Sequence, residues 1–203
     1  MIRERSEIKS IAKQRLAANR GNAVLIYLVT GVIMVGAGTI IPGLGALLAT
    51  PITVGMMFAF LKIWRDGDGQ VNDIFSKLSD YGRMLGGILW MELWIFIWSL
   101  LFVIPGLIKA LAYSLTPLIL VDCPNVPATE AIRLSMRITN GHKGKIFVFY
   151  LSYIGWGILS GLTFGILEIV HVGPYRSIAF AGLYEELKAE AVRSGAVTES
   201  ELA

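Results

Sequence analysis

The sequence predicts an all-α membrane protein whose helices form a six-span bundle. The 203-residue chain is 55% hydrophobic and only 16% charged, whereas soluble domains carry about 25% charged residues. Long stretches contain no charged residue, and the lysines and arginines gather between them. We therefore expect a single polytopic membrane domain over 1–203. Three parallel hairpin repeats would build it, each preceded by a cytoplasmic amphipathic helix.

The first two spans follow from a stretch without charges. Between Arg20 and Lys62, 41 residues contain no Asp, Glu, Lys or Arg, which corresponds to roughly 61 Å of helix against a bilayer core of about 30 Å. Pro42 and Gly43 lie near the middle of this stretch and favour a reversal. Spans are expected near 22–41 and 43–62. A secretory signal peptide is the alternative, but the run is longer than the about 7–15 apolar residues of such a peptide.

The remaining four spans are expected on either side of two further outer turns. The turns are Pro105-Gly106 and Gly173-Pro174. The spans are expected at 86–104, 107–121, 146–170 and 174–191. Only the uncharged residues 177–184 separate Arg176 from Glu185. The sixth span is therefore either short or packed inside the bundle, where polar residues find partners.

The basic residues predict the orientation. With six spans, 16 of the 18 lysines and arginines fall on one side of the membrane, and only Lys109 and Arg176 fall on the other. By the positive-inside rule both termini are cytoplasmic. The basic residues behind the net charge of +3 then lie next to membrane spans, where they contact lipid headgroups, and no nucleic-acid partner is expected.

A shift of 63 residues places Ile41-Pro42-Gly43-Leu44 on Ile104-Pro105-Gly106-Leu107 and indicates an internal repeat. Apolar residues at helical spacing precede each pair of spans, and they are Ile8, Ile11, Ala12 and Leu16, then Val71, Ile74, Phe75 and Leu78, then Ala128, Ala131 and Ile132. The repeat units are about 6–64, 70–122 and 126–190, and a flexible tail follows at 192–203. Chance recurrence of proline–glycine turns is the alternative explanation.

Five polar residues at or near membrane depth form a candidate polar pocket. They are Glu92, Lys109, Glu168, His171 and Arg176. Such groups are costly in lipid and usually face the bundle interior in pairs, so Lys109–Glu168 or Arg176–Glu168 pairing is expected. The alternative to a ligand pocket is a structural ion pair with basic side chains that snorkel.

Glycines and the absence of catalytic motifs complete the pattern. Gly157, Gly161 and Gly165 form a ridge in the fifth span that permits close helix packing, either within the chain or in a homodimer. No nucleophile elbow, metalloprotease motif, phosphate-binding loop or dinucleotide fingerprint occurs. With one cysteine, Cys123, and two histidines, we expect no enzyme activity, no metal site and no cofactor.

Several blocks resemble a known family. They are Pro105-Gly106-Leu107-Ile108-Lys109-Ala110, Tyr113-Ser114-Leu115-Thr116-Pro117, Thr129-Glu130-Ala131-Ile132-Arg133-Leu134-Ser135, Asn140-Gly141-His142-Lys143, Gly155-Trp156-Gly157-Ile158-Leu159 and Leu183-Tyr184-Glu185-Glu186-Leu187. With these blocks the chain resembles the bacterial integral membrane proteins labelled domain of unknown function 975. It is distantly similar to the membrane domain attached to some glycerophosphodiester phosphodiesterases. The resemblance implies a multi-pass protein of the bacterial cytoplasmic membrane and transfers no activity.

These observations lead to two functional hypotheses. The first is a non-enzymatic membrane protein that binds or helps translocate a small amphiphile, peptide or lipid. The second is a structural or regulatory subunit that docks another membrane protein through its amphipathic helices and glycine ridge.

Overall fold

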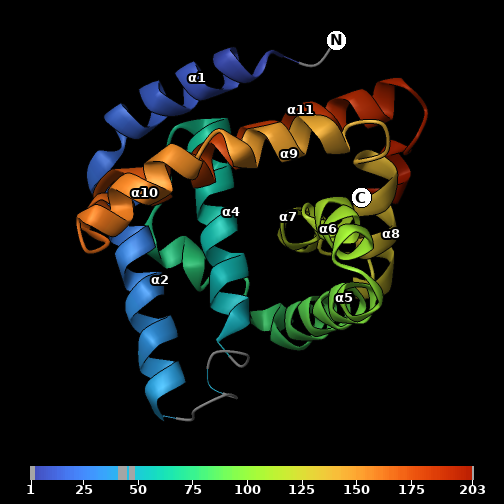
Figure 1. Ribbon diagram of the computed structural model, residues 1–203, viewed down its shortest axis with the longest axis horizontal. Coiled ribbons are helices and arrows are strands. Elements are labelled where there is room, and N and C mark those ends of the chain that lie inside the picture. The colour runs from blue at the N-terminus through green and yellow to red at the C-terminus, as the bar shows by residue number, and fades with distance from the viewer. Residues whose placement is uncertain (1–2, 41–44, 46–48, 203) are drawn as a thin grey trace.

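Figure 1 shows the computed structural model, which describes residues 3–40, 45 and 49–202 and, within them, no β-strand. The α-helices are α1 (Arg5–Ala18), α2 (Arg20–Ile40), α4 (Thr50–Asp66), α5 (Tyr81–Leu101), α6 (Val103–Tyr113), α7 (Thr116–Asp122), α8 (Ala128–Ile138), α9 (Lys143–Leu151), α10 (Ile154–Leu162) and α11 (Gly173–Arg193). Three short 3₁₀ segments are η1 (Val71–Ile74), η2 (Leu78–Asp80) and η4 (Glu199–Glu201), and η3 (Glu168–Val172) is a π-helix.

Four helical segments of the described chain are long and apolar enough to cross a bilayer. They are Arg20–Ile40, Val71–Leu100, Val103–Asp122 and Lys143–Leu162. This confirms the all-helical membrane class. The expected second and sixth spans are not among the four, because α4 has only 17 residues and α11 contains several charged residues.

The helices divide into an inner and an outer set. The inner helices are α4, α7 and α11: all residues of α7 from Thr116 to Val121 are buried, and so are eleven residues of α11. The outer helices are α2, α5, α9 and α10, on which large apolar side chains stay exposed, such as Val35 (68%) and Phe96 (65%). In a membrane protein these exposed surfaces face lipid. In Figure 1, α2 and α4 cross the direction of α9, α10 and α11.

Glycine permits the closest contact among the inner helices. A Cβ atom added at Gly182 of α11 would lie 2.4 Å from the ring of Trp64 on α4. No residue with a side chain can occupy that position without displacing the indole. The small residue therefore sets the separation of α4 and α11.

The C-terminal ends of α4 and α7 meet the second half of α11 in one charge network. Asp122, whose side chain is 6% exposed, accepts hydrogen bonds from Arg65, Lys188 and Tyr184 at 2.5, 2.5 and 2.8 Å. Arg65 also pairs with Glu185 at 2.5 Å. Because these residues come from the last turn of α4, the last residue of α7 and α11, the network ties together three distant parts of the sequence.

The second and third outer turns lie at other residues than expected. The chain reverses at Phe102, which is extended (φ −159°), so Pro105 and Gly106 lie inside the first turns of α6. Proline is accepted there because the first-turn N–H groups have no partner within a helix. Gly106 remains necessary, since an added Cβ would lie 2.2 Å from the Ser99 hydroxyl of α5.

The third reversal shows a larger shift. Gly173 and Pro174 begin α11, which continues directly from η3, and do not form a turn. The chain reverses at Phe164 and Gly165, whose φ angles are 51° and 82°. Gly165 therefore belongs to a turn and not to a helical ridge. Pro42 and Gly43 lie outside the described residues.

Two of the three expected amphipathic helices form. The apolar face of α1 (Ile8, Ala12 and Leu16) is buried along α11, beside which α1 lies in Figure 1, and α8 buries one face as well. The second segment forms η1 and η2 instead. There Asp73 accepts from the Gln70 backbone N–H at 2.8 Å and pairs with Lys62 at 2.8 Å, which fixes a tight turn against α4.

The C-terminal residues, expected to be a flexible tail, pack against α8. Val197 is 1% exposed. Arg137 of α8 donates to the Ala196 carbonyl at 2.6 Å and pairs with Glu201 at 2.6 Å. The Arg137 hydrogen bond, together with those from Thr198, lowers the pKa of Glu201 to about 2.

Candidate functional site

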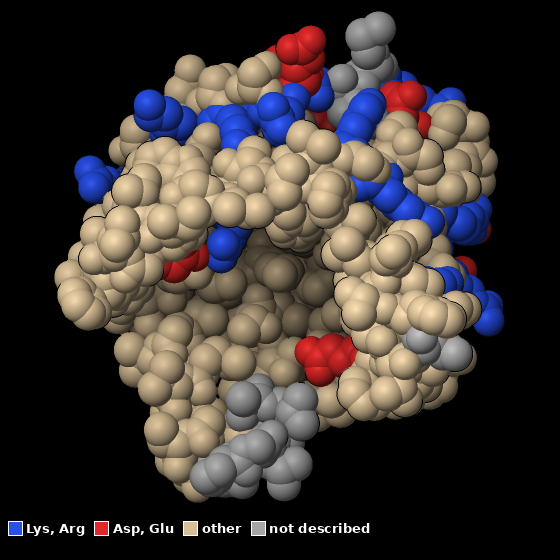
Figure 2. Space-filling model, in the orientation of Figure 1, with Lys and Arg blue, Asp and Glu red and all other residues tan. Residues whose placement is uncertain are grey.

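A cavity of about 200 Å³ lies between α2, α4, α7, α9 and α11. Its lining comes from all three predicted units: Tyr27, Met56 and Met57 from the first, Ser114 and Leu118 from the second, and Tyr150, Arg176, Ser177 and Phe180 from the third. Figure 2 shows that this face of the molecule is hollowed between α4, α6 and α9 and that few charged side chains lie within the hollow. The cavity therefore joins sequence positions that are far apart.

Arg176 and Glu168 form the charged part of the site. Arg176 Nη2 lies 2.8 Å from Glu168 Oε1, which confirms one of the two ion pairs predicted from the sequence. The Glu168 carboxylate also accepts from the Tyr27 hydroxyl at 3.1 Å and from the Ser160 hydroxyl at 3.2 Å. Three donors therefore hold the carboxylate, and the arginine lines the cavity.

The π-helix η3 positions this carboxylate. Its wider turn occurs where the chain passes from the reversal at Gly165 into α11. π-Helical turns are frequent at functional sites. A Cβ atom added at Gly173 would lie 2.3 Å from the Tyr27 ring. Gly173 therefore lets Tyr27 reach Glu168, which is a different role from the turn that its sequence predicts.

A second, apolar groove of about 430 Å³ adjoins the cavity. Its lining residues are Leu107, Ala110, Leu111, Ser114, Phe147, Tyr150, Leu151 and Ile154, from α6, α9 and their continuations. Ser114 and Tyr150 line both spaces. Since Leu107, Leu151 and Ile154 are about half exposed (48%, 49% and 56%), the groove opens on the lipid-facing surface.

Three of the five predicted pocket residues lie elsewhere. The Lys109 ammonium lies over the rings of Trp98 and Tyr113, at 5.1 and 5.7 Å from their centroids, and does not pair with Glu168. Glu92 is exposed on α5, and the described part of the chain gives it no ion pair. His171 stacks on Tyr175 and lies beside Trp156. A single pocket of all five residues was therefore a wrong prediction.

The glycine ridge does not pack within the chain. A Cβ atom added at Gly157 or Gly161 would meet no atom within 4 Å among the described residues. Both glycines are exposed on α10. The internal packing expected for this ridge was wrong, and the contact with a second copy stays a prediction.

Metal and thiol chemistry find no support among the described residues. No group of three or more His, Cys, Asp or Glu side chains there could hold a metal ion. Cys123 is buried, and burial raises the pKa of its thiol. A raised pKa lowers the thiolate fraction, and the thiolate is the reactive form.

Sequence reasoning missed the hydroxyl groups of this site. Tyr27 lies in the charge-free stretch before Lys62, and Ser160 and Ser114 lie in apolar runs. A polar side chain inside an otherwise apolar span was the available signal, because such groups face protein and not lipid. The charged residues alone did not identify these three hydroxyl-bearing residues of the site.

Comparison with known proteins places the chain in a family. Neither a curated protein nor a solved structure matches it. The family model described as "Protein of unknown function (DUF975)" matches residues 74–191. That match includes η3, Glu168, Arg176 and both walls of the apolar groove. The chain therefore belongs to the DUF975 family, whose function is unknown.

Proposed function

We propose that this protein is a non-enzymatic binding module for a single-chain anionic amphiphile. The observation that carries the proposal is the continuity of a small polar cavity with an apolar groove open to lipid. Arg176 would bind the phosphate or carboxylate of the ligand, and the groove between α6 and α9 would take its alkyl chain. Exchange through the groove would let the protein help move the amphiphile between the bilayer and its interior.

The dimensions and chemistry of the two spaces support this assignment. Ligand pockets are mostly apolar, with a few placed polar groups that fix orientation. The cavity has Met56, Met57 and Phe180 beside one guanidinium group, and the groove is almost wholly apolar. Arg176 carries five N–H groups, and one of them donates to Glu168. The others are suited to an anionic headgroup.

Substitution of Arg176 tests the proposal. Binding of oleate and of oleoyl lysophosphatidylglycerol to the detergent-purified protein would be measured by native mass spectrometry. Arg176→Gln should weaken both about tenfold or more, because a charge-assisted hydrogen bond contributes about 1.5–3 kcal/mol. Arg133→Gln is the matched control, since Arg133 has an exposed side chain on α8.

Two further probes separate headgroup from chain. Ala110→Phe narrows the groove and should weaken both ligands, while Ile158→Phe, an exposed site on α10, should not. Oleyl alcohol, which has no anionic group, should bind wild type about tenfold more weakly than oleate. Equal binding of oleate to wild type and to a correctly folded Arg176→Gln variant would refute the proposal.

We also propose that the chain crosses the bacterial cytoplasmic membrane six times as three hairpins, with both termini inside. The charge network at Asp122 supports it, because it brings the C-terminal ends of α4 and α7 together beside the second half of α11, as expected if two returning helices leave the membrane on the same side. The positive-inside bias agrees.

Cysteine labelling tests the topology. With Cys123→Ala as background, Thr163→Cys should react with an impermeant maleimide in intact cells, and Ser200→Cys only after lysis. Both positions lie at the protein surface, since Thr163 and Ser200 are exposed. Labelling of Ser200→Cys in intact cells would contradict the proposed orientation.

A docking subunit is the second candidate, and one observation favours it. Gly157 and Gly161 leave open space on the lipid-facing surface of α10, where a helix of another protein could approach closely. The apolar faces of α1 and α8 are already buried in this chain, so the ridge alone would dock. A stoichiometric partner lost on Gly161→Ile would support this role.

A further inference from the structure

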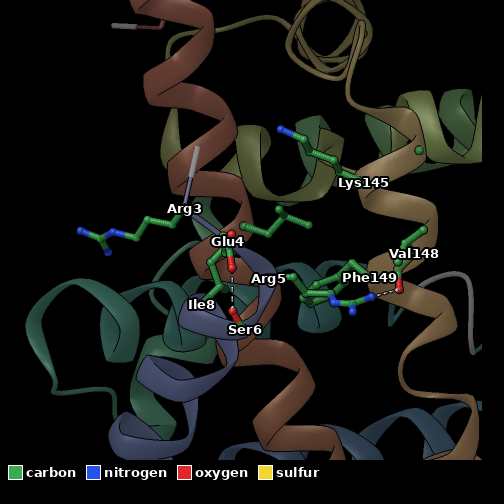
Figure 3. Close-up of a pocket in the computed structure, with 10 residues that line it drawn as sticks. Arg3, Glu4, Arg5, Ser6, Ile8, Lys145, Val148 and Phe149 are labelled. Carbon is green, nitrogen blue, oxygen red and sulfur yellow. Dashed lines mark hydrogen bonds between the residues drawn. The ribbon is translucent and has the colours of Figure 1, made fainter. Parts of the chain in front are cut away.

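We propose that a separate cleft at the N-terminal end of α9 binds the phosphate of one anionic phospholipid. The cleft has a volume of about 630 Å³. It lies between the beginning of α1, the first turns of α9 and Leu183 of α11 (Figure 3). None of its residues lines the cavity at Arg176, so the inference is independent of the amphiphile proposal.

Two basic side chains at this cleft have no acidic partner in the described part of the chain. Arg5 donates one long hydrogen bond, 3.4 Å, to the Val148 carbonyl. Lys145 extends from α9 over the open space of the cleft in Figure 3. Arg3 differs, because it is paired with Glu186 at 3.3 Å. The positive charge of the cleft is therefore shared between α1 and α9. The cleft also contains one carboxylate, that of Glu4, which accepts a hydrogen bond from the Ser6 hydroxyl at 3.3 Å.

The first turn of α9 adds favourable electrostatics. Gly144 lines the cleft, and an added Cβ there would meet no atom within 4 Å. Backbone N–H groups at a helix start have no partner within the helix and favour anions. With Arg5 and Lys145 on either side, this turn can bind a phosphate. The helix end alone would not select a phosphate, and the two basic side chains provide that selectivity.

The position of the cleft favours a lipid over a free anion. It lies at the start of Lys143–Leu162, one of the four apolar helices, so its phosphate would lie at the headgroup level. Gly144 and Val148 lie one turn apart on a single face of α9, and both line the cleft. Val148 is 44% exposed, so an acyl chain can run along this face from the phosphate.

A bound lipid would also bridge two elements. α1 contacts the end of α9, where Lys9 donates to the Ser152 hydroxyl at 2.6 Å and lies 4.2 Å from the centre of the Tyr153 ring. A phosphate held by Arg5 and Lys145 would join the same two helices at the other end of α9. The lipid would therefore add a second link between α1 and α9, besides the Lys9 contacts near the break between α9 and α10.

Native mass spectrometry of the full chain tests the site, with phosphatidylglycerol and phosphatidylcholine of identical acyl chains. Wild type should retain one phosphatidylglycerol. The double variant Arg5→Gln/Lys145→Gln should bind it at least tenfold more weakly. Lys13→Gln/Arg133→Gln removes the same charge from exposed helix positions and should change binding less than twofold. Arg176→Gln should leave this binding unchanged.

Three results would overturn the proposal. Equal loss in the control variant would show general surface attraction, and equal retention of phosphatidylcholine would show that charge is not recognised. Full displacement of the lipid by millimolar inorganic phosphate would show a site for a free anion. Circular dichroism of each variant verifies the fold, and Arg5→Lys/Lys145→Arg, which keeps both charges, should retain most of the binding.

Discussion

The inner and outer helices of this protein differ in a way opposite to that of a soluble domain. The outer helices α2, α5, α9 and α10 are apolar and little buried, whereas the inner α4 is too short, and the inner α11 too charged, to count among the four candidate spans. The inner α7 is the exception, because it is both apolar and buried. Lipid contact demands apolar side chains, while polar groups require protein partners. The comparison of α2 with α11 therefore shows that high hydropathy accompanies low burial where a helix faces lipid.

The largest effect is expected where inner helices share charge. Asp122→Ala leaves Lys188 without its carboxylate partner and Arg65 with Glu185 alone, and loss of one member of such a nearly buried network costs about 3 kcal/mol. Thermal unfolding in detergent should show a clear decrease in stability. Asp68→Ala, an exposed position after α4, is the control. Equal stabilities of the two variants would contradict the division into inner and outer helices.

An intermediate effect is expected from a matched pair of glycines. Gly182→Ala places a methyl group 2.4 Å from the Trp64 ring, and overpacking of this kind costs about 1–3 kcal/mol. Gly157→Ala on the outer α10 meets open space and should be neutral or slightly stabilising. Chemical denaturation of both variants measures the difference. A larger loss for Gly157→Ala would show that α10 is packed against a partner.

The smallest effect is expected at the tail, where a comparable ion pair lies at the surface. The Arg137 hydrogen bond and those from Thr198 lower the pKa of Glu201 from 4.5 to about 2. A depressed pKa stabilises the docked tail above pH 4.5, and this stabilisation is lost as the pH falls toward 2. Protection of the amides at 196–202, measured by hydrogen exchange relative to the intrinsic rate at each pH, should fall over that interval, and Arg137→Gln should remove most of this pH dependence. Unchanged protection in acid would mean that Val197 alone holds the tail.

The sequence predicted the helical membrane class and the Arg176–Glu168 pair, because both depend on the cost of polar groups in lipid. It misplaced the second and third turns because proline–glycine dipeptides suit the first turn of a helix as well as a reversal. The reversals occur at Phe102, which is not a typical turn residue, and at Phe164-Gly165, where the sequence pattern assigned the glycine to a helical ridge instead. The grouping of Lys109 with Glu168 failed because two nearby rings attract the ammonium group. The depth of a residue in the membrane can be predicted from the sequence. The direction in which its side chain points around the helix can be determined only when the packing of the helices is known.

The contact between α1 and α11 constrains how the protein is made. The ribosome produces α1 before α11, so the apolar face of Ile8, Ala12 and Leu16 lacks its main partner helix until α11 has been made. Their apolar face needs a temporary cover, and the membrane surface next to the translocon provides one. If translation stops before Leu183, the apolar face of α1 has not yet met α11 and remains covered by the membrane surface.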